Sequence, residues 1–307
     1  MFPYKSEFDN LVDFKTTRQE ALITAKQYLT NENIDHSQFS TVIRDNDKIT
    51  QDYNVVRTGW TVWMEGDSYE YIDYIKEYAD ETQQSSTNII NELYSKHISP
   101  FLWQVRFYKP GLEREYKINI DMKNNKVIGF EYKLADTTYL PFLTADAAEN
   151  LAENELISSW GFDKTKYTLY KNSKDEKENR TDYDLSFQSE NIIGEARYIY
   201  NVTVQGNQIG AVSKDFKLPE EWKRDYEKST IFSISRFTYQ VLFFLGFSIL
   251  ILFTTMKLLK TADPPWKYVF SLGALFTLIE ALDYINDSTE FMWWYATETI
   301  LSGYIVE

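Results

Sequence analysis

One long uncharged stretch limits what this chain can fold into. Residues 238–256, TYQVLFFLGFSILILFTTM, lie within a run of 20 residues between Arg236 and Lys257 that carries no formal charge. At about 1.5 Å per residue, a helix of that length spans the roughly 30 Å of a bilayer core. A buried core helix is the alternative, but such a helix keeps a polar face, and here apolar residues cover every face. We therefore predict a transmembrane helix.

The composition restricts the classes of function. The 307 residues carry a net charge of -14, and the pI is near 4.8. Because phosphate binding needs a basic surface, this charge argues against a nucleic-acid partner. The absence of cysteine excludes disulfides, thiolate metal sites and a cysteine nucleophile. The two histidines, His36 and His97, are predicted to be surface or capping residues, so we expect no metal site and no cofactor.

The region before the long stretch begins with an amphipathic helix. Residues 17–30 carry apolar side chains on one face, and Thr17 and Glu20 have the spacing of a capping box. A short strand is expected at residues 39–44. The polar residues 45–52 are predicted to form a turn.

The next hundred residues change from helical to strand periodicity. Apolar spacing predicts helices at residues 67–79 and 87–94, with the loop DETQQSS between them. Strands of period two are then expected at residues 102–108, 115–121 and 126–134, with turn residues at the connections. This order predicts an antiparallel meander.

A later segment repeats the start of the chain. In both places a threonine, two alanines and a leucine recur at every fourth position, followed by an aspartate and an aromatic residue four positions apart. A buried helix face favours such spacing by itself. The aspartate and aromatic residue that follow both helices, however, favour a duplication. We therefore expect residues 17–41 and 144–168 to fold alike, as a helix followed by a strand. The matched residues are Thr17, Ala21, Ala25, Leu29, Asp35 and Phe39, and Thr144, Ala148, Ala152, Leu156, Asp163 and Tyr167.

The second copy also continues into strands, which defines the expected fold class. That class is α+β, with two tandem units of a helix on an antiparallel sheet, at residues 1–140 and 141–229, followed by transmembrane α-helices at residues 230–307. The dipeptide Gly206-Asn207 is predicted to be a tight hairpin turn. The strands of the second copy are expected at residues 166–171, 182–188, 195–204 and 208–218.

Three stretches carry a family resemblance. Residues 105–134 read VRFYKPGLEREYKINIDMKNNKVIGFEYKL, residues 179–187 read NRTDYDLSF, and residues 194–228 read GEARYIYNVTVQGNQIGAVSKDFKLPEEWKRDYEK. Together they resemble the extracytoplasmic region of long bacterial members of the CPBP family, the CAAX-protease and bacteriocin-processing intramembrane proteases. The helix-plus-hairpin units are similar to PepSY/cystatin-like domains. The resemblance covers most of residues 1–230 and continues into the first membrane helices.

The resemblance implies peptide-bond hydrolysis inside the bilayer, by a glutamate pair with an arginine and by histidines on later helices. The membrane region has no Glu-Glu-x-x-x-Arg run, and no histidine follows His97. Glu280 and Asp283 share a helix face and are interpreted as marking a helix that emerges into the interface. Glu298 is the better candidate for a buried polar role, but alone it makes no catalytic site. We therefore predict that the chain has no catalytic residues and cleaves no peptide.

Other candidates have simpler interpretations. Asn201 begins a glycosylation sequon, but it lies in a predicted strand and the resemblance is bacterial. Trp266, Trp293 and Trp294 are predicted to be interface anchors of membrane helices. The alternating aromatic residues of the strands are interpreted as core and cross-strand pairs.

Two functions remain open. In the first, the chain is the N-terminal soluble and first transmembrane part of a CPBP-family intramembrane protease, and its soluble units position or screen a peptide or protein substrate. In the second, it is a non-enzymatic membrane-anchored protein that binds a peptide or acts as a sensor. Both place the chain in a bacterial cell membrane, with several passes and the lipid bilayer as partner. The resemblance also implies an anchor before Phe2 and catalytic helices after Glu307.

The loop charges predict the topology. Residues 257–267 carry three lysines, and residues 283–290 carry no basic residue. The positive-inside rule therefore places the first loop in the cytoplasm and the soluble region outside. Basic residues just before the membrane stretch argue the other way, although residues that flank a large translocated domain count for less. They are Lys223, Arg224, Lys228 and Arg236.

Overall fold

The structure is a computed structural model that describes residues 15–47, 70–96, 101–229, 231–261, 266–286 and 292–293. The chain divides into two compact units. The sheet unit comprises Met1–Tyr53, Tyr69–Pro219 and Met292–Glu307, and the helical unit comprises Asn54–Ser68 and Glu220–Phe291. Within the described residues the fold is α+β, as predicted, with one eight-stranded antiparallel sheet and seven helices.

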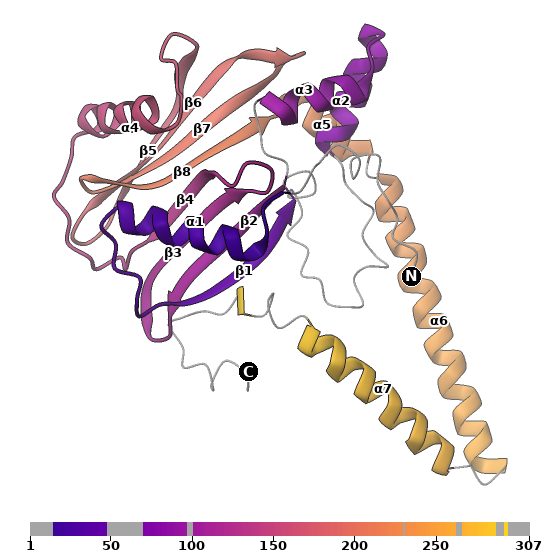
Figure 1. Cartoon of the computed structure of the whole chain (residues 1–307). Coiled ribbons are helices and arrows are strands. Elements are labelled where there is room, and N and C mark those ends of the chain that lie inside the picture. Colours follow the sequence, from indigo (N-terminus) through magenta and orange to yellow (C-terminus); the bar gives the residue numbers. More distant parts are fainter. Residues whose placement is uncertain are drawn as a thin grey trace. The chain divides into compact units, whose positions relative to one another are not determined.

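The sheet unit is built on a single sheet in the order β1-β2-β3-β4-β8-β7-β6-β5 (Figure 1). Each half of this order is a meander of four consecutive strands, and every neighbouring pair is antiparallel. The two predicted copies therefore share one sheet. The strands are β1 (Ser40–Asp47), β2 (Phe101–Lys109), β3 (Leu112–Asp121), β4 (Val127–Lys133), β5 (Tyr167–Glu176), β6 (Thr181–Ile193), β7 (Ala196–Gln205) and β8 (Gln208–Lys217).

The helices that precede the two meanders begin in the same way. Thr17 caps α1 (Arg18–Asn31) with backbone angles of -76° and 159°, and Thr144 caps α4 (Ala145–Ser159) with angles of -76° and 160°. At Thr17 the capping box with Glu20 is complete, as predicted, whereas α4 has an alanine at the third position. Both segments fold as a helix followed by a strand, which confirms that part of the duplication hypothesis. Both helices bury the predicted residues, Ala21, Ala25 and Leu29 in α1 and Ala148, Ala152 and Leu156 in α4.

The two copies meet where β4 pairs with β8. Phe130 lies opposite Val212 at this seam. Phe130 pairs with Ile118 of β3, and Val212 pairs with Val202 of β7, so the two seam residues occupy corresponding places in their meanders. The approach is close, because a Cβ on Gly129 would lie 2.9 Å from the carbonyl oxygen of Val212. The seam therefore relates the two halves by an approximate two-fold axis.

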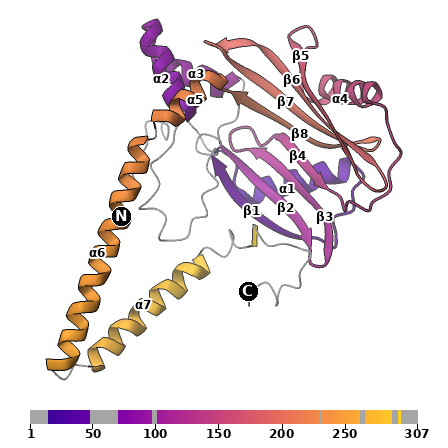
Figure 2. The same ribbon diagram turned by 180° about the vertical axis from the view of Figure 1, so that it is seen from behind.

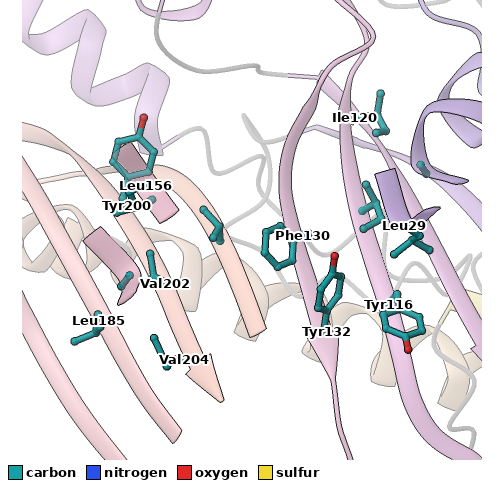
Figure 3. Close-up of a cluster of buried hydrophobic side chains, with 14 of the residues drawn as sticks. Leu29, Tyr116, Ile120, Phe130, Tyr132, Leu156, Leu185, Tyr200, Val202 and Val204 are labelled. Carbon is teal, nitrogen blue, oxygen red and sulfur yellow. The ribbon is translucent and has the colours of Figure 1, made fainter. Parts of the chain in front are cut away.

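One hydrophobic core serves both halves. α1 packs on β2–β4 and α4 packs on β6–β8, and the buried residues of both helices belong to one cluster with the strands. Figure 3 shows Phe130 and Tyr132 in the middle of this cluster, between Leu29 of α1 and Leu156 of α4. Phe130 contacts both sides directly, since its ring centroid lies 5.7 Å from Tyr28 and 5.9 Å from Trp160.

Two further helices belong to the sheet unit. They are α2 (Glu70–Thr82) and α3 (Ser86–Lys96). The Tyr74 hydroxyl donates to the carbonyl oxygen of Ile193 at 3.0 Å and accepts from the backbone N–H of Glu195 at 3.1 Å. This contact requires glycine between those two residues, because a Cβ on Gly194 would lie 2.6 Å from the hydroxyl oxygen. The β6–β7 turn is thereby fixed to α2.

The helical unit contains α5 (Glu220–Ser229), α6 (Ile231–Thr261) and α7 (Trp266–Asn286). The uncharged stretch of the sequence forms a helix within α6, as predicted. Its apolar side chains are exposed, from 43% at Val241 to 67% at Phe253. When only the described residues are counted, no helix is long and apolar enough to qualify as a membrane crossing.

The predicted elements differ from the structure mainly at their ends. The predicted turn at residues 45–52 is wrong in its first part, because β1 continues to Asp47, where Asp45 pairs with Trp103 and Asp47 with Phe101. The rest of that turn lies outside the described residues. The predicted helix at residues 67–79 continues to Thr82, so most of the expected DETQQSS loop is helical, and its predicted first three residues lie outside the described residues. Most of the other described elements lie where the sequence predicts them, but β5 and β6 each end five residues later than predicted, and the helix α5 (Glu220–Ser229) was not predicted.

Candidate functional site

The face of the sheet away from α1 and α4 is predominantly polar, and Figure 2 shows this face of β1–β4 in front of α1. Strand alternation sends every second side chain there. In the second copy these side chains form a hydrogen-bonded row across three strands. Ser186 donates to the Asn201 side chain at 2.8 Å, and Asn201 donates to Asp215 at 2.9 Å. Ser213 also donates to Asp215, at 3.0 Å.

The first copy continues the polar face with different chemistry. Arg44 donates to the Gln104 side chain at 2.9 Å, and Gln104 donates to Asn119 at 3.1 Å. Lys117 and Glu131 form an ion pair at 3.2 Å. That pair is exposed, and exposed pairs contribute little to stability. The row therefore combines cationic and amide side chains suited to polar recognition.

A buried ion pair on this face marks the candidate functional site. Arg106 of β2 is 4% exposed and binds Glu115 of β3 through two parallel hydrogen bonds, of 2.8 Å from Nε and 2.7 Å from Nη2. Its remaining nitrogen, Nη1, donates to the carbonyl oxygen of Met292 at 3.0 Å and to that of Trp293. A buried ion pair is costly unless its hydrogen-bonding groups are satisfied, and the two carbonyls help to meet that need.

The Trp293 side chain lies in the same site. It is 6% exposed and forms a small apolar cluster with Val42 and Tyr108, against which Met292 packs. The Arg44 guanidinium lies over the indole, with its central carbon 4.2 Å from the ring centroid. The prediction that Trp293 is a membrane-interface anchor is therefore wrong, because the ring is buried against the sheet. This site, formed by Val42, Arg44, Arg106, Tyr108 and Glu115, is called the Trp293 site below.

The seam carries a second titratable group of residues. Burial raises the pKa of the Tyr28 and Tyr132 phenols, and the neighbouring Glu32 carboxylate raises that of Tyr28 further. Burial, and the charge of Glu155, also raise the pKa of Glu32. These side chains pack in or beside the hydrophobic core. Their properties follow from packing, and we assign them no chemical role.

The aspartates that follow α1 and α4 have similar hydrogen bonds and similar pKa shifts. Asp35 accepts from the backbone N–H of Ser37 at 2.9 Å, and Asp163 accepts from that of Thr165 at 3.0 Å. Hydrogen bonds from Ser37 lower the pKa of Asp35, and those from Thr165 lower the pKa of Asp163. The paired aspartates that suggested the duplication are therefore local turn-forming residues.

The remaining sequence candidates do not gather into a site. His36 is half-buried, its ring lies 5.7 Å from Phe107, and its Nδ1 lies 3.3 Å from the carbonyl oxygen of Ile34. Asn201 belongs to the polar row on the sheet. Glu280, Asp283 and Trp266 lie in α7, without a description of their side chains. His97, Trp294 and Glu298 lie outside the described residues.

Sequence reasoning missed the Trp293 site. Arg106, Glu115 and Arg44 are ordinary strand residues by pattern, and Trp293 is separated from Arg106 by 187 positions. The local signal was Arg106 itself, a charged residue in the interior of a strand whose other interior residues are uncharged. Among the described residues, no three acidic or histidine side chains are placed to hold a metal ion.

Comparison with the models of known protein families gives no match for this chain, and neither curated proteins nor solved structures provide one.

Proposed function

We propose that this chain is the membrane-anchored, non-catalytic N-terminal part of a CPBP-type intramembrane protease. In this role the sheet unit positions or screens a peptide or protein substrate, and α6 and α7 anchor it in a bacterial cell membrane. The family assignment rests on the resemblance of residues 105–134, 179–187 and 194–228. The soluble region lies outside the cytoplasm in this proposal, because residues 257–267 carry three lysines.

The exposed apolar surface of α6 is the observation that carries the anchoring. The side chains from Val241 to Phe253 that the structure describes are all exposed, and most of them are large and apolar. Water-soluble surfaces rarely keep contiguous apolar patches of more than a few hundred Å². Lipid tails would cover such a surface on every side of the helix. The proposal rests on the whole uncharged stretch of residues 238–256, which is longer than the run of side chains described in α6.

Membrane fractionation of the full chain in a bacterial host tests the anchoring. We expect the chain to stay with the membranes after an alkaline carbonate wash and to leave them in detergent. Changing Leu245 and Leu252 together to arginine should release it, because each arginine costs about 2.5–3.5 kcal/mol near a helix centre in the bilayer. The matched control is Ile157→Arg, on an exposed apolar residue of α4 in the sheet unit. A wild-type chain found in the soluble fraction would refute the anchoring.

A second candidate function is favoured by one contact. Arg106 binds the main-chain carbonyls of Met292 and Trp293, which is the chemistry of a peptide-binding site. The alternative is therefore a non-enzymatic membrane-anchored protein that binds a peptide or acts as a sensor. Both candidates expect the purified chain to cleave no peptide. Specific proteolysis that is lost on Glu298→Gln would contradict both.

A further inference from the structure

The Trp293 site recognises its occupant in two separable ways. Arg106 donates to two successive carbonyl oxygens, those of Met292 and Trp293, and carbonyls are common to every peptide. The indole is recognised by different groups, since Arg44 lies over the ring and Val42 and Tyr108 pack around it. The main-chain contacts fix the position of the segment, and the ring contacts select an aromatic side chain.

The sheet also prepares the site before it is occupied. Glu115 holds the Arg106 guanidinium through two hydrogen bonds, so Nη1 points in a fixed direction. All the groups named come from neighbouring strands, β1, β2 and β3, that are joined in a continuous register. A site built on rigid strands binds with little loss of conformational freedom. The occupying segment, by contrast, contributes one ring and two carbonyls.

We propose that the Trp293 site is a binding site for short peptide segments that carry a tryptophan, and that Met292 and Trp293 are its tethered occupant. A peptide from another protein would bind by displacing them. The inference rests on the peptide-holding role described above but does not depend on the membrane anchoring. It deepens that role by naming the ligand as a tryptophan-containing segment, bound through main-chain carbonyls and the indole.

The tether sets the strength of the competition. A ligand that belongs to the same chain competes at an effective concentration of about millimolar, so a free peptide competes poorly with it. Weakening the tethered ligand therefore raises the apparent affinity for a free peptide, because a larger fraction of the protein has an open site. Trp293→Ala removes the ring while leaving the receptor residues intact.

The test measures binding of a labelled peptide to the full chain in detergent by fluorescence anisotropy. The probe has the sequence of residues 290–296, EFMWWYA, followed by three lysines for solubility. We expect it to bind Trp293→Ala at least about tenfold more tightly than the wild type. A probe with both tryptophans changed to alanine, and detergent without protein, serve as controls for partition into micelles. Equal affinity of the probe for the wild type and Trp293→Ala overturns the proposal.

Receptor variants then locate the binding. In the Trp293→Ala background, Arg44→Gln should weaken the probe about three- to tenfold, because it removes the cation over the ring without disturbing the buried ion pair. The double change Arg106→Gln with Glu115→Gln keeps the pair neutral and should abolish binding, with folding checked by circular dichroism. Lys117→Gln, on the same face but outside the site, should leave binding unchanged. Unaltered binding in the Arg44 and Arg106 variants also overturns the proposal.

The two sets of experiments fail independently. If the chain binds the probe but washes off membranes, the proposed Trp293 site is supported and the proposed anchoring is refuted. If the chain stays in membranes but does not bind the probe, even as the Trp293→Ala variant, the anchoring is supported and the proposed site is refuted.

Discussion

Replacing Leu29 or Leu156 by alanine tests whether the two copies share one core. Both leucines are fully buried, one in each helix of the duplicated pattern, and both belong to the same cluster. Each change removes three carbon atoms, a loss of roughly 2.4 kcal/mol at about 0.8 kcal/mol per buried methylene. The cavity left behind raises the expected loss in the free energy of unfolding to about 3–5 kcal/mol. That is a large fraction of the roughly 5–15 kcal/mol of a typical domain.

Native-state hydrogen exchange read by mass spectrometry is the suitable assay. Peptides from β2 and β3 report on the first copy, and peptides from β6 and β7 report on the second. Because the core is continuous through Phe130, Leu29→Ala should lower the protection of both sets by a similar free energy, and Leu156→Ala should do the same. The helical unit need not be removed, since each peptide reports only on its own segment.

Exposed residues of the same helices provide matched controls. Ile23 of α1 is 51% exposed and Ile157 of α4 is 49% exposed, so changing either to alanine should alter protection by less than about 0.5 kcal/mol. Two results would refute the reasoning. One is a loss below about 1 kcal/mol for the buried leucines, and the other is a loss confined to the copy that carries the change.

Three further predictions concern caps, a buried charge and alkaline pH. Thr17→Ala should lower the free energy of unfolding by about 1 kcal/mol or more. Thr144→Ala should lower it by less, because only Thr17 belongs to a capping box. Urea denaturation measures both changes. Arg180→Gln should cost about 3–5 kcal/mol in the same assay, since Arg180 is 2% exposed and its loss leaves a buried carboxylate without its partner charge. Burial raises the pKa of Tyr200 to about 12 and raises that of Tyr132, so these phenols stay neutral in the folded state at pH values where the unfolded chain ionises. Their contribution to stability should therefore be constant below about pH 10 and fall above it, as absorbance at 295 nm and urea midpoints would show.

Local patterns predicted most of the elements. The capping threonines, the four-residue spacing of buried residues and the Gly206-Asn207 turn each depend on neighbours within one turn or hairpin, which the sequence displays directly. The end of β1 could not be found in this way, because Asp45 is polar and becomes part of a strand only through its pairing with Trp103. The sequence also could not predict that one sheet joins the copies, since only two residue pairs link β4 to β8.

The Trp293 site could not be predicted from local patterns either, because it depends on contacts between residues that are distant in the sequence. Tryptophan near apolar helices is common at membrane interfaces, and this general preference led to the wrong environment for Trp293. The partner that decides its position, Arg106, lies in a strand far away in the sequence. A long-range contact through main-chain carbonyls leaves no signature in the residue types of the segment that supplies them.

The pairing of Phe130 with Val212 has an evolutionary consequence, because corresponding residues that face each other across a two-fold axis are what a symmetric dimer presents at its interface. A single ancestral copy could have formed such a dimer through its last strand, and joining two genes would then have fixed the pair in one chain. Once joined, each copy was free to change alone. By register, the position of Arg106 corresponds to Ser186, and that of Glu115 to Ile199, so the second copy has no counterpart of the buried ion pair. One half now carries the Trp293 site, while the other supplies strands β5–β8 of the same sheet.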